Sequence, residues 1–446
     1  MAIGIAEDGF DQPMKINNDK KEEEEEINCL DWELMRKNYG LKDCDDDELK
    51  MLLSYEFDFL PPAIAKLFAF MVYLEKDKID EFTHCIEAKV CNKQFDEELE
   101  KCVQELGKMV SEDPRLGDIL QHHLLEILVT LLNHKQYPKL QSHAAIILQY
   151  VVAYSGNREV VMKFITPSII VNLMGSAVCE VQKQALSLLR NIAFGIPNCS
   201  KSKIVLKETL ESLTSLIDSF NESTGDDLLC IGSKTLALAC QVYLDFCPDE
   251  LESVLQAFMK LLKYESIRVP LYACSGIMYL CDGKQKMVVE EQQLGTLVDR
   301  LIELIDSDSR VKTIGGLTAL GSIVRWGSDS NVEVIIEKDT LSSLECLLGE
   351  DDMYYVKNAC WIISNITARK ENHIKSVIDA GLIEPLVDVV ENYELLDVKR
   401  VAARAISNAI YGLGLDQFRR LRNNPVKPLG DLLKVLRDDK QFVSVC

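Results

Sequence analysis

Apolar residues recur at helical spacing along most of the chain, and residues 356–369 show the pattern most clearly. Four of them, at i, i+3, i+4 and i+7, predict one apolar stripe on a helix: Ala359, Ile362, Ile363 and Ile366. Trp361 and Asn365 are four residues apart, so they share a different face of the same helix. A second apolar block follows at 373–390, where an Ala-Gly step at Gly381 predicts a break between a short helix and a longer one.

Weaker copies of this two-block unit fill the chain from Glu97 onward. Aligned on the position of Trp361, they place six residues at equivalent points: Ile146, Ser187, Ser275, Thr318, Trp361 and Arg404. The last four follow one another at intervals of 43 residues, and the first two are 41 residues apart. A sustained period in the low forties is typical of armadillo and HEAT repeats, which bury their stripes against neighbouring copies. We therefore expect an all-α, right-handed superhelical solenoid of about eight armadillo repeats with a long concave groove.

The charge pattern divides the chain into three segments. Residues 1–50 hold 16 Asp or Glu against 7 Lys or Arg, which predicts a disordered acidic segment; the alternative is an acidic tail that competes for basic ligands. Residues 51–96 contain helical patterns that fit no repeat, so we expect them to form a helical cap. Residues 97–446 are expected to be the armadillo repeats.

Composition argues against several classes of function. A formal charge of −22 leaves no basic surplus for nucleic acid, and it suits either a protein that binds basic ligands or one that is simply soluble. The 15 cysteines include no CxxC pair, which predicts buried, small apolar residues in a reducing compartment rather than a zinc site. The apolar run at 63–74 is too short to span a membrane. No phosphate loop, activated nucleophile or metal motif is present, so we expect neither an enzyme nor a metal or cofactor.

Six short motifs carry a family resemblance: ACWIISNITA, VIDAGLIEPLV, YACSGIMYLCDG, LTALGSIV, RNIAFG and RAISNA. They resemble the repeats of importin α, the adaptor that binds nuclear localisation signals, over about residues 97–440. The resemblance implies extended peptides of cargo proteins as partners, in the cytoplasm and the nucleus. In this family the last helix of each repeat presents a Trp and, four residues on, an Asn to the groove. The Asn amide can bond a peptide backbone in both directions, and neighbouring Trp rings form slots for Lys side chains.

The chain departs from that family pattern at most repeats. The main peptide site has lost its tryptophans, with Ser187 at one Trp position and Asn191 as the surviving asparagine. Further along, the resemblance assigns peptide contact to six more residues: Tyr279, Ser322, Trp361, Asn365, Arg404 and Asn408. Only Trp361 and Asn365 form a complete pair, and Arg404 would repel a basic ligand. Ligand contact is not the sole interpretation of these residues. Trp361 could serve in packing, and Asn191 and Asn408 could each be an inherited surface residue.

Two parts of the family pattern are absent from this sequence. Residues 1–60 lack the basic segment that binds importin β, so we do not expect importin β to bind through residues 1–50. The family's last two repeats would follow after Cys446. The leading hypothesis is a divergent importin α-like adaptor with a weakened main site. The alternative is an armadillo scaffold that binds another protein partner without recognising localisation signals.

Overall fold

The computed structural model describes residues 62–194, 200–242, 246–282 and 291–413. Every regular element in these residues is a helix, which confirms the prediction of an all-α armadillo solenoid. The chain divides into two compact units, residues 1–78 and 79–446. Helix α4 (Pro62–Cys91) falls inside the segment expected to form a cap, and its capping role stays a prediction. The acidic segment 1–50 lies outside the described residues.

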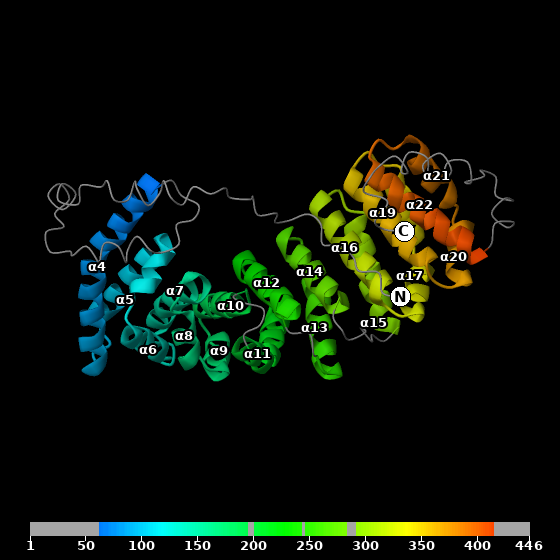
Figure 1. Ribbon diagram of the computed structural model, residues 1–446. Coiled ribbons are helices and arrows are strands. Elements are labelled where there is room, and N and C mark those ends of the chain that lie inside the picture. The colour runs from blue at the N-terminus through cyan, green and yellow to red at the C-terminus, as the bar shows by residue number, and fades with distance from the viewer. Residues whose placement is uncertain (1–61, 195–199, 243–245, 283–290, 414–446) are drawn as a thin grey trace. The chain divides into compact units, whose positions relative to one another are not determined.

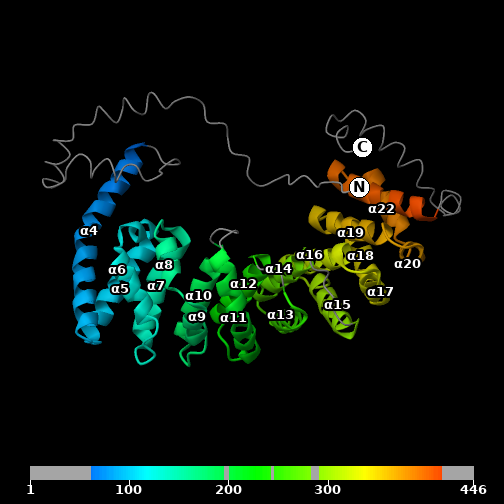
Figure 2. The same ribbon diagram turned by 60° about the horizontal axis from the view of Figure 1, so that its bottom comes forward.

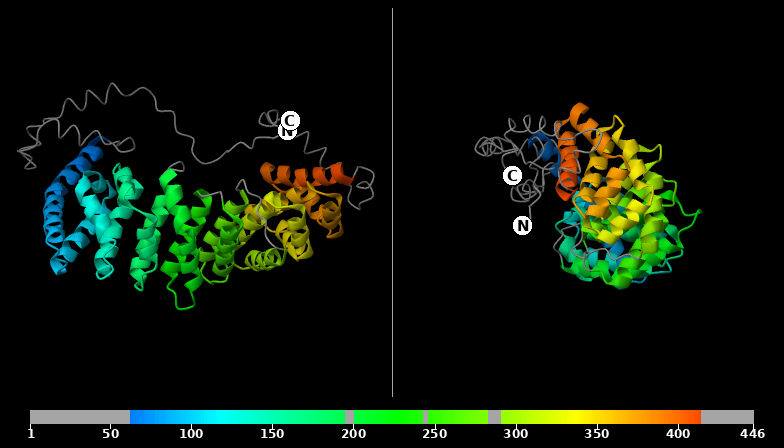
Figure 3. Two further views of the ribbon diagram at one scale, coloured as in Figure 1. Left: turned by 90° about the horizontal axis from the view of Figure 1, so that it is seen from below. Right: turned by 90° about the vertical axis from the view of Figure 1, so that its right-hand side faces the viewer.

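Eight helices of the second unit form a continuous series in which each contacts the next. We call them the ladder helices: α5 (Glu97–Glu112), α7 (Pro138–Tyr154), α10 (Cys179–Phe194), α12 (Asp226–Val242), α14 (Arg268–Asp282), α16 (Arg310–Trp326), α19 (Met353–Thr367) and α22 (Leu396–Leu413). Figure 1 shows them in this order from cyan to red, and Figures 2 and 3 show the same order from other directions. Six of them carry the positions aligned from the sequence, from Ile146 on α7 to Arg404 on α22, while α5 begins at Glu97, where the repeats are expected to begin. Eight ladder helices in the described residues agree with the expected number of about eight repeats.

Other helices fill the intervals between the ladder helices and pack against them. These flanking helices are η1 (a 3₁₀ helix, Pro114–Ile119), α6 (His122–Leu131), α8 (Arg158–Phe164), α9 (Pro167–Met174), α11 (Ser200–Ser219), α13 (Pro248–Leu261), α15 (Glu291–Ile305), α17 (Asp329–Glu337), α18 (Thr340–Leu348), α20 (Glu371–Asp379) and α21 (Ile383–Asn392). The core lies where the apolar stripe of a ladder helix meets its neighbours. Each repeat therefore depends on adjacent repeats for burial.

Helix α19 shows how the sequence produces one such repeat. Its N-terminus is capped by Asp352, whose carboxylate accepts a hydrogen bond from the Tyr354 amide at 2.9 Å. The four stripe residues are all fully buried: Ala359, Ile362, Ile363 and Ile366. Burying each isoleucine contributes about 1.5–3 kcal/mol, so the stripe fixes which face of α19 turns inward. Trp361 and Asn365 remain partly exposed, as their place off the stripe predicts.

The predicted break at Gly381 is present between α20 and α21. Gly381 has φ +78°, a left-handed conformation that glycine adopts without steric cost. The following amide, that of Leu382, donates to the carbonyl of Val377 at 3.2 Å and so satisfies the end of α20.

Two arginines tie the ends of successive ladder helices together. Arg158 is buried, and its guanidinium donates to the carbonyls of Val152 on α7 and of Asn191 and Ile192 on α10. Arg369 donates in the same manner to carbonyls at the end of α16 and pairs with Asp329 at 3.0 Å. These side chains satisfy helix carbonyls that have no partner within their own helix.

The burial of each cysteine depends on its position in a helix and not on its residue type. Five are buried, as predicted: Cys230, Cys240, Cys274, Cys281 and Cys360. Four are exposed, so the prediction is wrong for them: Cys91, Cys179, Cys247 and Cys346. Three of these lie at a helix end, and Cys346 lies on the outward side of α18. Burial is decided by the stripe, and a cysteine off the stripe stays in solvent.

Candidate functional site

Helices α19 and α22 bring four of the predicted site residues to one place. Ser364 of α19 is the common contact. Its hydroxyl accepts a hydrogen bond from Nε of Arg404 at 2.9 Å, and its carbonyl accepts one from Nδ2 of Asn408 at 3.0 Å. Trp361 and Asn365 flank Ser364 on the same helix. Thus Arg404 and Asn408 of α22 both contact Ser364, which lies between Trp361 and Asn365 on α19.

Trp361 lies against α16 as well as facing outward. The indole occupies space over Gly321, because a Cβ built on that glycine would lie 2.2 Å from Cζ3 of Trp361. The side chain is half-buried. Packing and ligand contact were alternatives at the level of sequence. The structure gives Trp361 a packing contact and leaves part of its surface accessible to a ligand.

Sequence reasoning missed two residues beside Trp361. Cζ of Arg325, at the end of α16, lies 6.0 Å from the ring centroid of Trp361 and 4.8 Å from that of Trp326. Both contacts have cation–π geometry. Arg325 is seven residues after Thr318, so helical periodicity alone would have placed it on the same face. We call Arg325, Trp326, Trp361, Asn365, Arg404 and Asn408 the Trp361 cluster.

The cluster carries positive charge at close quarters. Burial, and after it the nearby guanidinium of Arg325, lowers the pKa of Arg404 from its ordinary value. Neither arginine forms an ion pair with a carboxylate of the described residues. Since Trp361 already has a guanidinium near its ring, a lysine placed there would meet two like charges.

The three asparagines differ in how their amides are held. Nδ2 of Asn191 donates to the carbonyl of Gln149 on α7 at 2.9 Å, which matches the bond from Asn408 to Ser364. One N–H and the carbonyl oxygen of Asn408 stay unused within the described residues. Nδ2 of Asn365 is buried and finds no acceptor among the described residues. Asn365 therefore has a buried donor without an acceptor, whereas Asn408 has an unused N–H and an unused carbonyl oxygen beside its bond to Ser364.

The other predicted site residues lie elsewhere on the ladder. Ser187 on α10 and Ser322 on α16 are buried, with 6% and 5% of their surface exposed. Asn191 lies one turn after Ser187, and Tyr279 is partly exposed on α14. Helix α16 separates α14 from α19, and two further ladder helices separate α10 from α16. The structure thus gathers one cluster at α16, α19 and α22 and leaves Ser187, Asn191 and Tyr279 outside it.

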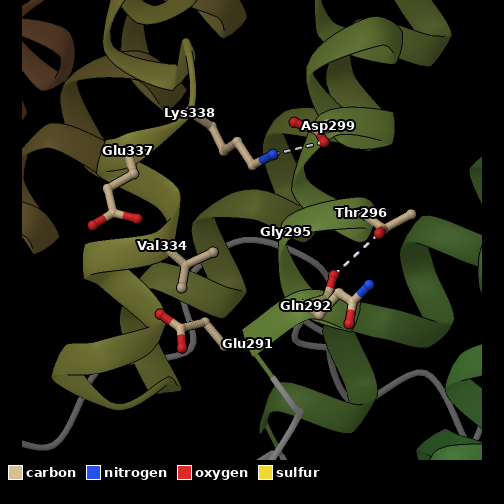
Figure 4. A pocket seen from close by; sticks show the side chains of 8 residues that line it. All are labelled: Glu291, Gln292, Gly295, Thr296, Asp299, Val334, Glu337 and Lys338. Atoms are coloured by element: carbon tan, nitrogen blue, oxygen red, sulfur yellow. Dashed lines mark hydrogen bonds and ion pairs between the residues drawn. The ribbon is translucent and has the colours of Figure 1, made fainter.

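Two pockets lie on flanking helices and contain none of the predicted residues. One, of about 620 Å³, opens between α15 and α17, where Lys338 and Asp299 form an ion pair at 2.8 Å (Figure 4). The other, of about 820 Å³, lies between α18 and α21 and is rich in carboxylates. No group of three or more metal-ligating side chains occurs in the described residues. No helix of the part described is long and apolar enough to cross a membrane.

Comparisons with known proteins agree with the repeat architecture. Residues 120–223 match a family model described as Armadillo-like. Importin subunit alpha-1a of Oryza sativa subsp. japonica is 32% identical over 281 residues, covering 63% of this chain and 52% of the relative. Importin subunit alpha-1b of the same plant is 31% identical, and importin subunit alpha-4 of Arabidopsis thaliana 32%; each match covers 76% of this chain and 62% of the relative. The chain thus spans about half to three-fifths of the length of these relatives.

Solved structures also resemble the fold. The crystal structure of an engineered protein matches with a TM-score of 0.58 and 19% sequence identity, covering 89% of this chain and 96% of that protein. At this identity the match describes the fold alone.

Proposed function

Since the chain is a divergent importin-α-like armadillo protein, we propose that it is an adaptor that binds extended peptides along the ladder helices. Its ligands on this proposal are nuclear localisation signals of cargo proteins, which it carries for import into the nucleus. It would then work in the cytoplasm and the nucleus, without catalysis. Support comes from the relatives, which are named importin α subunits, and from the placement of side chains on α19 and α22.

The observation that carries the proposal is the presence of an asparagine amide on each of two adjacent ladder helices, α19 and α22. Nδ2 of Asn365 on α19 is buried without an acceptor among the described residues, and Asn408 on α22 is oriented by its bond to Ser364 while its second N–H and its carbonyl oxygen stay unused there. An extended peptide presents alternating N–H and C=O groups, which asparagine amides can bond in both directions. Trp361 lies beside the first amide and offers a flat apolar surface to one peptide side chain.

The main site of the family is expected to bind weakly in this chain. Its Trp positions hold other residues, and Ser187 leaves too little surface to replace an indole. Each lost cation–π contact costs about 0.5–2 kcal/mol. The resemblance implies three missing tryptophans in that site, and three such losses predict at least about a tenfold weaker hold on a Lys-rich peptide.

A peptide titration tests the proposal. The full chain is titrated with a fluorescent Lys-rich localisation-signal peptide at two salt concentrations, together with Asn365→Ala. Losing an amide contact costs about 1–3 kcal/mol, which predicts roughly 5- to 150-fold weaker binding by Asn365→Ala. Asn392→Ala on α21 is the matched control, because Asn392 lies on a flanking helix and bonds only Asp388 in the described residues.

Three results would count against this function. If the unaltered chain shows no salt-sensitive binding of the peptide, the proposed adaptor function is wrong. It is also wrong if the Asn365→Ala variant binds the peptide with unchanged affinity. Weakening by Asn392→Ala alone would move the interaction to the flanking helices and favour the scaffold alternative.

A further inference from the structure

The Trp361 cluster contains two guanidiniums that pair with no carboxylate of the described residues, in a chain that is rich in carboxylates. Six other arginines of the described residues contact a carboxylate within 4 Å: Arg115, Arg268, Arg300, Arg310, Arg369 and Arg400. Arg325 and Arg404 do not, nor does Arg190, whose Nε donates to Oδ1 of Asn191, although the sequence has 71 Asp or Glu against 49 Lys or Arg. Like charges at close range raise the free energy of the unliganded surface. A bound anionic group would lower it.

The same place has more hydrogen-bond donors than acceptors. Arg404 uses Nε on the Ser364 hydroxyl, and no described residue accepts from its two Nη groups. The Arg325 guanidinium donates to no described residue either. A donor surplus of this kind matches a ligand that brings acceptors only. An ionised carboxylate is such a group, since it accepts hydrogen bonds and donates none.

Both guanidiniums are held in place before any ligand arrives. Trp326 and Trp361 lie beside Arg325, and Ser364 fixes Arg404 at Nε. Immobilised side chains lose little further entropy on binding. A planar guanidinium can also meet a carboxylate with two parallel hydrogen bonds, a geometry that lysine cannot offer.

We propose that the Trp361 cluster binds an acidic side chain, so that the preferred peptide at α16, α19 and α22 carries consecutive Glu or Asp residues. This inference rests on the proposed function for its binding face, but not for the basic character of the ligand. The net charge of −22 repels acidic peptides at long range. Near 0.15 M salt that field is screened beyond about 8 Å, so a preference for acidic residues would report on the local cluster.

Three ten-residue peptides test the proposal. They share neutral Gly-Ser flanks and differ only in a central run of four Glu, four Gln or four Lys. Each carries a fluorophore and is titrated with the full chain at 150 mM salt, a condition fixed for every arm. The Glu peptide is expected to bind most tightly and the Lys peptide most weakly. Arg325→Gln and Arg404→Gln should each weaken the Glu peptide by at least about tenfold and leave the Gln peptide unchanged.

Lys375→Gln is the matched control. It removes one positive charge from α20, where Lys375 pairs with Glu371 at 2.6 Å, and should leave the order of the peptides unchanged. Circular dichroism of each variant checks that the helices are intact.

The outcomes separate this inference from the function proposed above. If the Lys peptide binds more tightly than the Glu peptide, the adaptor stands and the acidic preference is overturned. If only the Glu peptide binds, the preference for basic signals fails and the acidic site stands. Binding of none of the peptides overturns both. If millimolar inorganic phosphate displaces the Glu peptide completely, the cluster is a site for small anions and the peptide commitment is wrong.

Discussion

Replacing Gly321 with alanine tests the contact that places Trp361. Gly321 lies within α16, where alanine is intrinsically favoured over glycine by about 1 kcal/mol. A Cβ at this position would lie 2.2 Å from Cζ3 and 2.8 Å from Cε3 of Trp361, and 3.2 Å from Cγ1 of Ile362. The ring cannot avoid the new methyl by a small adjustment, because α16 and α19 are packed along their length.

The expected net effect follows from two opposing terms. Overpacking of a fitted interface costs about 1–3 kcal/mol, which exceeds or offsets the gain in helix propensity. Gly321→Ala should therefore destabilise the chain by about 0–2 kcal/mol. Gly107→Ala is the matched control: Gly107 is buried in α5 and faces α7, yet its added Cβ would meet neighbours at 3.6 Å or more. That variant should be stabilised by up to about 1 kcal/mol.

Two measurements distinguish these outcomes. Repeat arrays do not always unfold in one step, so hydrogen exchange of α16 and α19 amides is followed together with thermal unfolding. The change is then repeated in a Trp361→Ala background, where no ring opposes the methyl. There Gly321→Ala should become stabilising, like Gly107→Ala. If Gly321→Ala already stabilises the unaltered chain as much as Gly107→Ala does, the indole does not lie over α16, and the cluster geometry is refuted.

Three further predictions concern the ladder and the N-terminal segment. Arg158→Met should lower the free energy of unfolding by about 2–4 kcal/mol, because buried helix carbonyls lose a charged donor. Thermal unfolding measures this loss. An equal loss in Arg190→Met, at a partly exposed residue, would contradict the prediction. Burial raises the pKa of the Cys274 thiol from 9.0 to about 12. Unfolded thiols ionise first as pH rises through this interval, so stability should fall from pH 9 to 12, and less steeply in Cys274→Ala; equal slopes in urea titrations would argue against a buried thiol. Finally, capture of importin β in a pull-down should not depend on residues 1–50; loss of capture on deleting them would show a binding segment there.

Much of the fold followed from the spacing of apolar residues. The stripe of α19 and the break at Gly381 were both predicted, because helical periodicity and glycine's access to positive φ are local properties. The prediction that the cysteines are buried failed for residues such as Cys346, since residue type does not say on which side of a helix a position lies. To predict which cysteines are buried, one must also know which face each helix turns toward its neighbours.

Only part of the candidate site could be predicted from the sequence. The resemblance picked out Trp361, Asn365, Arg404 and Asn408, but it did not reveal that Ser364 joins the two helices. It missed Arg325, because a guanidinium placed over rings on two helices is a contact between repeats. It also assigned peptide contact to Ser187 and Ser322, which the structure leaves nearly buried.

The sequence by itself determined that this chain is a helical array, because each stripe is written in residues three and four apart. Tertiary structure decided which side chains of different repeats share one surface. Those contacts join positions about 40 residues apart, such as Ser364 and Arg404, and depend on how far and at what angle successive helices stack. The charge of the Trp361 cluster is thus a property of three packed helices, since Arg325 reaches Trp361 of α19 from α16 and Arg404 reaches Ser364 of α19 from α22.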